Sequence, residues 1–349
     1  MKIFVTGGLG FIGSNYILKK IGNHSVEILN YDKITYAANI QNLSSLESNP
    51  RYHFIKGDIC NMSAISKSIN DFQPDIIVNF AAESHVDRSI DSPMEFIQTN
   101  VVGTTNLLEA ALSYYNKLKN KDSFIFLHIS TDEVFGELDN SGYFTELSSY
   151  DPSSPYSASK ASSDHFVRAW NKTYNLPVMI SNCSNNFGPY QFPEKLIPLM
   201  IINCINRQKL PVYGNGENIR DWIYVEDHCD AIESILKKGV VGETYLIGSN
   251  NEVKNIDIVH MICDYFNKSH INQDDFDYLS LINFVDDRPG HDFRYAIDNS
   301  KITNKLGWKA QYSFYEALQY TIAWYIDNEK WYKNILKDKS IVRLGGISK

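Results

Sequence analysis

Cysteine is scarce in this sequence and follows no pattern. Among its 349 residues are five cysteines, none of them in a Cys-x-x-Cys pair: Cys60, Cys183, Cys204, Cys229 and Cys263. Neither a disulfide framework nor a cysteine zinc site is supported, and a reducing compartment such as the cytoplasm is expected. The histidines are dispersed without metal-ligand spacing, so we expect no metal site.

Long apolar runs and an excess of positive charge are also missing. The first apolar stretch is broken by Gly7, Gly8 and Gly10, which argues against a signal peptide, and no run approaches membrane-spanning length. The net charge of −8 argues against a dedicated nucleic-acid binder, which usually carries a basic domain. We therefore expect neither membrane nor nucleic acid as a partner.

Strand and helix patterns alternate along the first half of the chain. Strands are predicted at Ile3–Thr6, Val26–Tyr31, Tyr52–Ile55, Asp75–Phe80, Phe124–Ile129 and Pro177–Asn182. Helices are predicted at Ile12–Ile21, Met62–Phe72, Glu95–Tyr115 and Tyr156–Tyr174, with Pro93 as a start signal for the third. This alternation is typical of an α/β fold, a doubly wound parallel sheet of Rossmann type with helices on both faces.

The pattern changes after about Asn182, where turn-rich segments interrupt shorter elements. We expect a first domain over residues 1–182 that binds the dinucleotide and carries the catalytic residues. A smaller α/β substrate lobe should follow over residues 183–349, with some segments crossing back. No linker, repeat or low-complexity tract separates the halves, so the cleft between them is the expected site.

A glycine-rich motif lies between the first predicted strand and helix. Gly8, Gly10 and Gly13 fit G-x-G-x-x-G, Gly7 adds the G-x-x-G-x-x-G variant, and Asp32 ends the second strand. The glycines allow a tight turn and close backbone approach, while the helix N-terminus meets a pyrophosphate. Asp32 would accept hydrogen bonds from a ribose and repel a 2′-phosphate, which favours NAD over NADP. The alternative is a glycine-rich turn with an incidental aspartate.

Two further features near this motif have two interpretations each. Asp58 ends the third predicted strand and would either face the adenine or serve only as a turn residue. Ala81 and Ala82 follow the fourth strand, where small residues let a flat cofactor approach but also simply allow tight packing.

Tyr156 and Lys160 are four residues apart and share one face of the predicted helix. An ammonium near a tyrosine favours its phenolate, which can take a hydroxyl proton while a hydride leaves the same carbon. Thr131, on the loop after the fifth strand, carries a hydroxyl suited to orient the alcohol.

The Asp132-Glu133 pair follows Thr131 where ligands of open α/β sheets bind. Elimination of water needs a base for a carbon-bound proton and an acid for the departing hydroxyl. Two carboxyl groups can divide these roles if one stays protonated. The alternative interpretation is a surface turn with two solvated acids.

Longer sequence strings lead to a family resemblance. They cover residues 6–13, 81–89, 130–136, 155–160, 182–190, 192–198, 220–228 and 287–292. Over nearly its whole length the sequence resembles the extended short-chain dehydrogenase/reductase family, and within it the dTDP-glucose 4,6-dehydratases of deoxysugar biosynthesis. Phe135 and Phe187 stand where that family usually has Tyr, and Phe293 where it often has Arg.

The resemblance implies a set of site residues. Those for NAD are Gly7, Gly10, Phe11, Ile12, Gly13, Asp32, Lys33, Thr35, Asp58, Ile59, Ala81, Ala82, Thr99, Tyr156 and Lys160. Those for the nucleotide sugar are Ser84, Thr131, Asn185, Lys195, Leu196, Pro211, Tyr213, Arg220, Asn255 and Arg288. Arg220 and Arg288 would hold the diphosphate, and Tyr213 would stack on the base. The resemblance also implies a homodimer through the helices predicted at Glu95–Tyr115 and Ser157–Tyr174.

The implied reaction has three stages. Tyr156 takes the C4 hydroxyl proton as NAD⁺ receives the C4 hydride, with Thr131 holding the hydroxyl. Glu133 then removes the C5 proton while Asp132 protonates the departing C6 hydroxyl. The hydride finally returns to C6 and Glu133 returns a proton to C5, so the product is the 4-keto-6-deoxy sugar.

Other functions remain open at this point. A UDP-glucose 4,6-dehydratase would share all the chemistry. A nucleotide-sugar 4-epimerase would share the fold, NAD and the Tyr156–Lys160 pair, but would not need Asp132 and Glu133. A decarboxylase of the same superfamily would act on a glucuronate, and Asp132 argues against it. A non-catalytic NAD-binding sensor would have no reason to keep all four residues.

Overall fold

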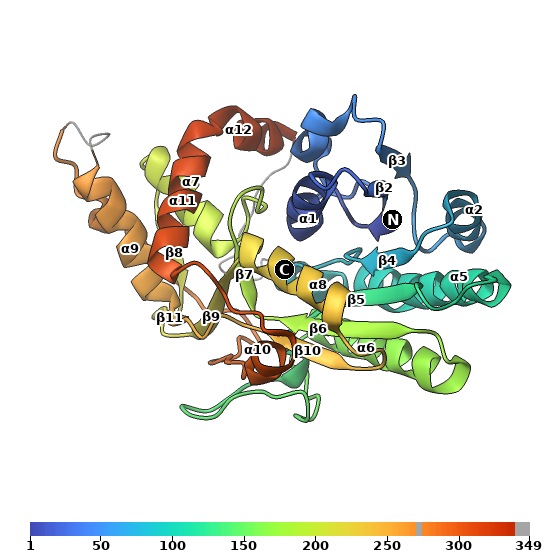
Figure 1. Cartoon of the computed structure of the whole chain (residues 1–349). Coiled ribbons are helices and arrows are strands. Elements are labelled where there is room, and N and C mark those ends of the chain that lie inside the picture. Colours follow the sequence, from blue (N-terminus) through green and yellow to red (C-terminus); the bar gives the residue numbers. More distant parts are fainter. Residues whose placement is uncertain (270–273, 339–349) are drawn as a thin grey trace.

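The centre of the molecule is a sheet of seven strands, shown by the computed structural model of the chain (Figure 1). The structure describes residues 1–269 and 274–338. The strands are β1 (Lys2–Thr6), β2 (Glu27–Asp32), β3 (Tyr52–Lys56), β4 (Ile76–Asn79), β5 (Ile125–Thr131), β6 (Val178–Cys183) and β10 (Thr244–Ile247). Their order is β10-β6-β5-β4-β1-β2-β3, and every neighbouring pair is parallel. The predicted Rossmann-type sheet is confirmed.

Helices cover both faces of this sheet. One face carries α1 (Phe11–Ile21), α8 (Val225–Lys238) and α10 (Ser300–Leu306), and the other carries α2 (Met62–Phe72), α5 (Thr104–Lys117) and α6 (Pro155–Tyr174). Side chains alternate along a strand, so Ile3 and Val5 of β1 pack on the α1 side and Phe4 packs on the α2 side. A short 3₁₀ helix, η1 (Ile40–Leu46), lies between β2 and β3.

The predicted helix over Glu95–Tyr115 is irregular. It begins as α4 (Pro93–Phe96), continues as a π-helical segment, η2 (Ile97–Gly103), and only then becomes α5. A π turn widens the helix by one residue, which hydrophobic spacing does not reveal. The short helix α3 (Val86–Asp91) precedes it and is absent from the sequence prediction. The other predicted elements occur with ends shifted by at most two residues.

The later part of the chain builds a smaller lobe, on the left in Figure 1. Its elements are β7 (Asn185–Phe187), α7 (Leu196–Ile205), β8 (Leu210–Tyr213), β9 (Ile219–Tyr224), β11 (Glu252–Lys254), α9 (Asn255–Lys268), η4 (Tyr278–Leu281), β12 (Ile282–Val285), α11 (Phe314–Asp327) and α12 (Glu329–Asp338). Strands β7, β9 and β11 form one small sheet, and β8 pairs with β12. Phe187, Met200 and Tyr325 lie in the buried apolar core of this lobe.

The chain crosses between the two lobes more than once. After β9 in the smaller lobe, α8 packs against α1, and β10 pairs with β6 at the edge of the large sheet. A boundary between residues 182 and 183 stays a prediction, since segments beyond it complete the first sheet. Within residues 1–269 and 274–338, no helix is both long and apolar enough to cross a membrane.

Phe187 offers a test of the smaller lobe's core. It is fully buried and its ring lies 5.2 Å from that of Phe314 and 5.8 Å from that of Tyr224. We expect Phe187→Ala to lower the free energy of unfolding by about 3–5 kcal/mol, because it leaves a cavity among aromatic rings. Denaturant unfolding followed by circular dichroism measures this. Phe284→Ala is the matched control, because Phe284 is 58% exposed on β12, and it should change the stability little.

Candidate active site

A cavity of about 300 Å³ opens at the carboxyl ends of the sheet strands, where ligands of such sheets bind. Every residue predicted to bind the cofactor lines it. Four of the residues predicted to bind substrate also line it: Ser84, Thr131, Asn185 and Lys195. The rest of the predicted substrate residues are not among its lining: Leu196, Pro211, Tyr213, Arg220, Asn255 and Arg288. The individual roles remain predictions, but residues far apart in the sequence do meet at one cavity.

The glycine loop is packed too closely for side chains. Gly7 has a φ of 71°, and a Cβ there would lie 2.6 Å from the backbone nitrogen of Ala81. A Cβ on Gly13 would lie 2.5 Å from the carbonyl oxygen of Gly7. The first turn of α1 therefore approaches the loop backbone directly, with its N-terminal amides facing the cavity region. This geometry fits the pyrophosphate of a dinucleotide.

Asp32, at the end of β2, is tied to the same loop. One carboxylate oxygen accepts a hydrogen bond from the backbone of Leu9 at 2.9 Å, and the other accepts from Ile34 at 2.8 Å. Burial raises the pKa of Asp32, and these two hydrogen bonds oppose the rise. Asp32 thus fixes the glycine loop and lines the cavity at once, as a residue that receives a ribose would.

Asp58 and Lys33 form a second polar pair at this end of the cavity, 2.8 Å apart. Burial acts to raise the pKa of Asp58, but hydrogen bonds from Lys33 and from the Cys60 backbone leave it lowered. Asp58 is therefore held in place by an ion pair with Lys33 as well as by the hydrogen bond of a turn. Its contact with adenine stays a prediction.

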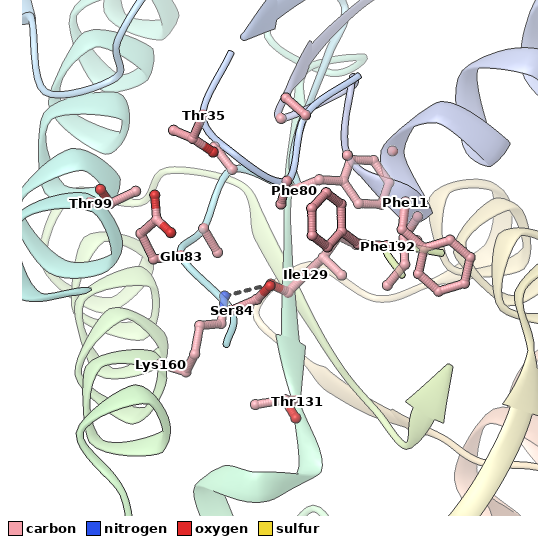
Figure 2. A pocket seen from close by; sticks show the side chains of 18 of the residues that line it. Phe11, Thr35, Phe80, Glu83, Ser84, Thr99, Ile129, Thr131, Lys160 and Phe192 are labelled. Atoms are coloured by element: carbon pink, nitrogen blue, oxygen red, sulfur yellow. Dashed lines mark hydrogen bonds between the residues drawn. The ribbon is translucent and has the colours of Figure 1, made fainter. Parts of the chain in front are cut away.

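Lys160 reaches from α6 to the sheet. Its ammonium donates to the carbonyl oxygen of Ile129 at 2.8 Å (Figure 2). Burial lowers the pKa of Lys160, although the charge of Asp164 acts to raise it. Figure 2 also shows Thr131 farther along β5, while Thr35, Thr99 and Glu83 lie across the cavity from Phe11, Phe80 and Phe192.

The tyrosine environment differs from the expectation. Tyr156 is buried, and burial followed by the charge of Glu133 raises its pKa well above the ordinary value, while a hydrogen bond with Thr131 opposes the rise. We expected Lys160 to lower this pKa. In the structure the Lys160 ammonium donates to Ile129, and burial, followed by the charge of Glu133, raises the pKa of Tyr156 instead. Thr131 does lie beside Tyr156, as an alcohol-orienting hydroxyl should.

Asp132 and Glu133 begin a 3₁₀ helix, η3 (Asp132–Phe135), capped by Thr131. The Thr131 hydroxyl accepts from the Glu133 backbone and donates to Asp132, both at 3.3 Å. Asp132 is 1% exposed, and one of its carboxyl oxygens has no hydrogen-bond partner. The alternative of two solvated surface acids is therefore wrong for this pair.

The two carboxyl groups have different electrostatic surroundings. Burial, then the charges of Glu133 and Asp221, raise the pKa of Asp132 well above its ordinary value. Burial also raises the pKa of Glu133, but Arg288, Arg220 and Lys195 oppose that rise. A neutral acid beside a carboxylate that faces cations is the arrangement that general acid–base chemistry requires.

The predicted diphosphate ligands meet near Glu133 rather than in the cavity lining. Arg288 forms an ion pair of 2.8 Å with Asp87, and the Tyr213 hydroxyl donates to the other oxygen of Asp87 at 3.1 Å. Arg220 donates to the carbonyl oxygen of Asp292 at 2.7 Å and lies 4.2 Å above the ring of Tyr295. The cations and the aromatic ring thus form one cluster that adjoins the catalytic carboxyl groups.

Sequence reasoning missed several residues of the site. Glu83 and Glu194 line the cavity and lie inside the quoted strings 81–89 and 192–198, so those strings could have found them. Phe80 is an apolar wall without a distinguishing pattern, whereas Phe192 begins the quoted string 192–198, which could have found it. Asp87 belongs to the unpredicted helix α3.

The chain is similar to a known family, to proteins from other organisms and to a solved structure. Residues 4–321 match the family of GDP-mannose 4,6 dehydratase. The chain is 52% identical over 349 residues to dTDP-glucose 4,6-dehydratase of Escherichia coli, covering 96% of each. It is 51% identical over 334 residues to the enzyme of that name from Xanthomonas campestris, covering 95% of each. A crystal structure of dTDP-glucose 4,6-dehydratase from Bacillus anthracis in complex with NAD is similar, with 43% identity and a TM-score of 0.86, over 96% of this chain and 99% of that one.

Gly13 tests whether the glycine loop holds a dinucleotide. A Cβ at this position would overlap the backbone of Gly7, so Gly13→Ala should displace the loop. We expect NAD to bind about ten- to a hundredfold more weakly, measured by calorimetry on cofactor-stripped protein. Gly22→Ala is the control, because Gly22 follows α1 outside the cavity lining and its Cβ would meet only the carbonyl oxygen of Lys19, at 3.3 Å. Equal affinity of both variants would contradict the assignment.

Proposed function

The chain belongs to the GDP-mannose 4,6 dehydratase family, and we propose that it is an NAD-dependent dTDP-glucose 4,6-dehydratase. It converts dTDP-glucose into dTDP-4-keto-6-deoxy-glucose and water. The observation that carries this proposal is the buried Asp132 directly before Glu133. Glu133 lines one cavity together with Thr131 and Tyr156. The names of relatives that are 51–52% identical over nearly their full length support the same substrate.

NAD fits the residues of the cavity. The backbone of the glycine loop packs so closely that a Cβ at Gly7 or Gly13 would overlap it, and Asp32 at the end of β2 lines the same cavity. Gly7, Gly10, Gly13 and Asp32 would hold the dinucleotide in this proposal. The chemistry supplied by bound NAD is the uptake of one hydride and its later return.

Oxidation at C4 relies on Tyr156 and Thr131. Thr131 holds the C4 hydroxyl and Tyr156 accepts its proton. Burial, then the charge of Glu133, raise the pKa of Tyr156 well above its ordinary value, so the tyrosine must lose its own proton before it can take that of the C4 hydroxyl. In this proposal the ammonium of Lys160, one helical turn after Tyr156 on α6, supplies the positive charge that favours the phenolate.

Elimination relies on the two carboxyl groups. The C4 ketone acidifies the C5 proton, which Glu133 removes. Asp132, whose pKa burial and the charge of Glu133 raise well above its ordinary value, gives a proton to the departing C6 hydroxyl. Glu133 then returns a proton to C5 as C6 is reduced. A 4-epimerase has no water to eliminate and gains nothing from a buried neutral aspartic acid.

The substrate diphosphate requires local cations in a chain whose net charge is −8. We place it near Arg220, Arg288 and Lys195, which already act together on Glu133. Planar guanidinium groups suit phosphate oxygens, and Tyr213 lies beside Arg288 for stacking on the base. A thymine methyl is worth only about 1–3 kcal/mol in an apolar pocket, so selectivity over UDP-glucose should be modest.

We also propose a cytoplasmic homodimer. The helices α4, η2 and α6 pack side by side and expose apolar side chains, notably Met94 at 69%, together with Ile97 and Phe166. Pairing of this surface with its copy would cover them. All five cysteines are free, which suits a reducing compartment.

A turnover assay tests the proposed function. The purified protein is expected to convert dTDP-glucose into a product lighter by one water, detected by mass spectrometry, without added stoichiometric NAD. UDP-glucose in the same assay should give a lower kcat/KM. An unchanged mass with an inverted C4 would show an epimerase. NADH that accumulates in step with product would exclude an internally returned hydride, and better use of UDP-glucose would overturn the assigned base.

Substitutions should separate the steps of the reaction. Asp132→Asn and Glu133→Gln are expected to lose about 10²–10⁴ in overall rate, because a positioned acid or base is gone, yet to keep C4 oxidation. Tyr156→Phe should block that oxidation. Single-turnover absorbance of the nicotinamide and mass analysis of the sugar distinguish the two. Dehydration at the wild-type rate in both carboxyl variants would refute the mechanism.

A further inference from the structure

A chain of buried polar groups lies behind Lys160, outside the cavity. His128, on β5, places its Nε2 atom 3.5 Å from the Lys160 ammonium and 3.4 Å from the Oδ1 atom of Asp164. Asp164 lies on α6, one helical turn after Lys160, and is fully buried, while His128 is 1% exposed. None of the catalytic steps described above uses this pair.

The orientation of the His128 ring is fixed from the opposite side. The Thr6 hydroxyl donates to the Oδ1 atom of Asn79 at 2.6 Å, which turns the Asn79 amide nitrogen towards His128. That nitrogen lies 3.0 Å from the Nδ1 atom of His128. Nδ1 is thus the acceptor and Nε2 carries the proton, aimed at Asp164.

Oδ1 of Asp164 faces His128 but has no hydrogen-bond partner, and the hydrogen bonds are made by the second oxygen, Oδ2. It accepts from the Tyr150 hydroxyl at 2.8 Å and from the Asn182 amide at 3.0 Å. Arg168 donates to the Tyr150 hydroxyl at 2.6 Å, so a second cation lies at the outer end of the network. A buried carboxylate is costly without such partners, and the hydrogen bonds from Tyr150 and Asn182 offset that cost.

The charge balance around Lys160 depends on this carboxylate. The titratable groups near it are Tyr156 and Asp164 on α6, His128 on β5 and Cys183 on β6. Burial lowers the pKa of Lys160 and of His128 alike, so His128 is neutral. Asp164 is the anion that acts most strongly to keep Lys160 protonated.

We propose that Asp164 and His128 are positioning residues that hold Lys160 as an ammonium in reach of the catalytic tyrosine. Asp164 supplies the counter-charge, and the neutral His128, whose tautomer Asn79 sets, lies between the two and turns its Nε2 proton towards Asp164 without accepting a hydrogen bond from Lys160. The inference rests on the proposed role of Lys160 in C4 oxidation. It adds that two buried residues behind Lys160, Asp164 and His128, stabilise the ammonium form of that lysine.

The test is the pH dependence of dehydration by Asp164→Asn. The amide keeps the size of the side chain and removes its charge, so Lys160 should lose its proton at lower pH. We expect the alkaline limb of the kcat profile to move down by about 1–3 pH units, with activity approaching wild type at the acidic end. An unchanged limb with a uniformly lower rate would overturn the proposal, since that is the result of a purely structural role.

Three further variants make the outcome decisive. Asp164→Glu keeps the charge and should keep the limb near its wild-type position. Tyr150→Phe removes one hydrogen bond to Asp164 but no charge, and should also leave the limb in place. His128→Gln should shift the limb in the same direction as Asp164→Asn. If Asp164→Asn does not fold, His128→Gln decides the question, and a wild-type profile for it overturns the proposal.

A double-variant cycle separates action through Lys160 from other effects. In a Lys160→Met background, Asp164→Asn should lower the rate of C4 oxidation by less than about twofold, because the ammonium it serves is absent. A full multiplicative loss would contradict the proposal. Wild-type protein that produces no dehydrated sugar in the same assay would instead show that the proposed function is wrong, so the two failures are distinguishable.

Discussion

The parallel pairing of β5 with β4 on one side and β6 on the other is the constraint on which the site depends. In this register His128 lies opposite Asn79, Ser130 opposite Asn182, and Thr131 opposite Cys183. Successive side chains of a strand point to opposite faces, so a slip by one residue would turn each of these away from its partner. The pairing of β5 ends at Thr131, and η3 with Asp132 and Glu133 begins at the next residue. The strand pairing therefore fixes where these two carboxyl groups lie.

Electrostatics follows from that geometry. Asp132 follows a buried strand and is removed from water, which raises its pKa. The charges of Glu133 and Asp221 raise that pKa further. Arg220, Arg288 and Lys195 converge on Glu133 from the smaller lobe, so the two neighbouring acids respond differently to the same pH. An acidic chain can therefore prepare a local site for an anionic substrate, because a few oriented cations outweigh a distant net charge.

Much of this could be predicted from the sequence, and the reasons are local. The glycine loop, the strand ends and the spacing of Tyr156 and Lys160 depend on short-range geometry that residue type alone expresses. The π-helical η2 could not be predicted, because one extra residue in a turn leaves no mark in the hydrophobic spacing. Helix α3 could not be predicted because its six residues are too few to show a helical period. The raised pKa of Tyr156 and the position of His128 between Lys160 and Asp164 depend on contacts between α6 and β5 or its following loop, which only the folded chain brings together.

The return of the chain to the large sheet, through α8 and β10, has a consequence for how the protein can be divided. A fragment ending near residue 182 would leave β6 as an open edge and would strip α8 from the apolar surface that it shares with α1. Unpaired edges and uncovered apolar faces favour self-association. The nucleotide-binding half is therefore no transferable module, and the fold should tolerate new partners only as additions at its termini or loops.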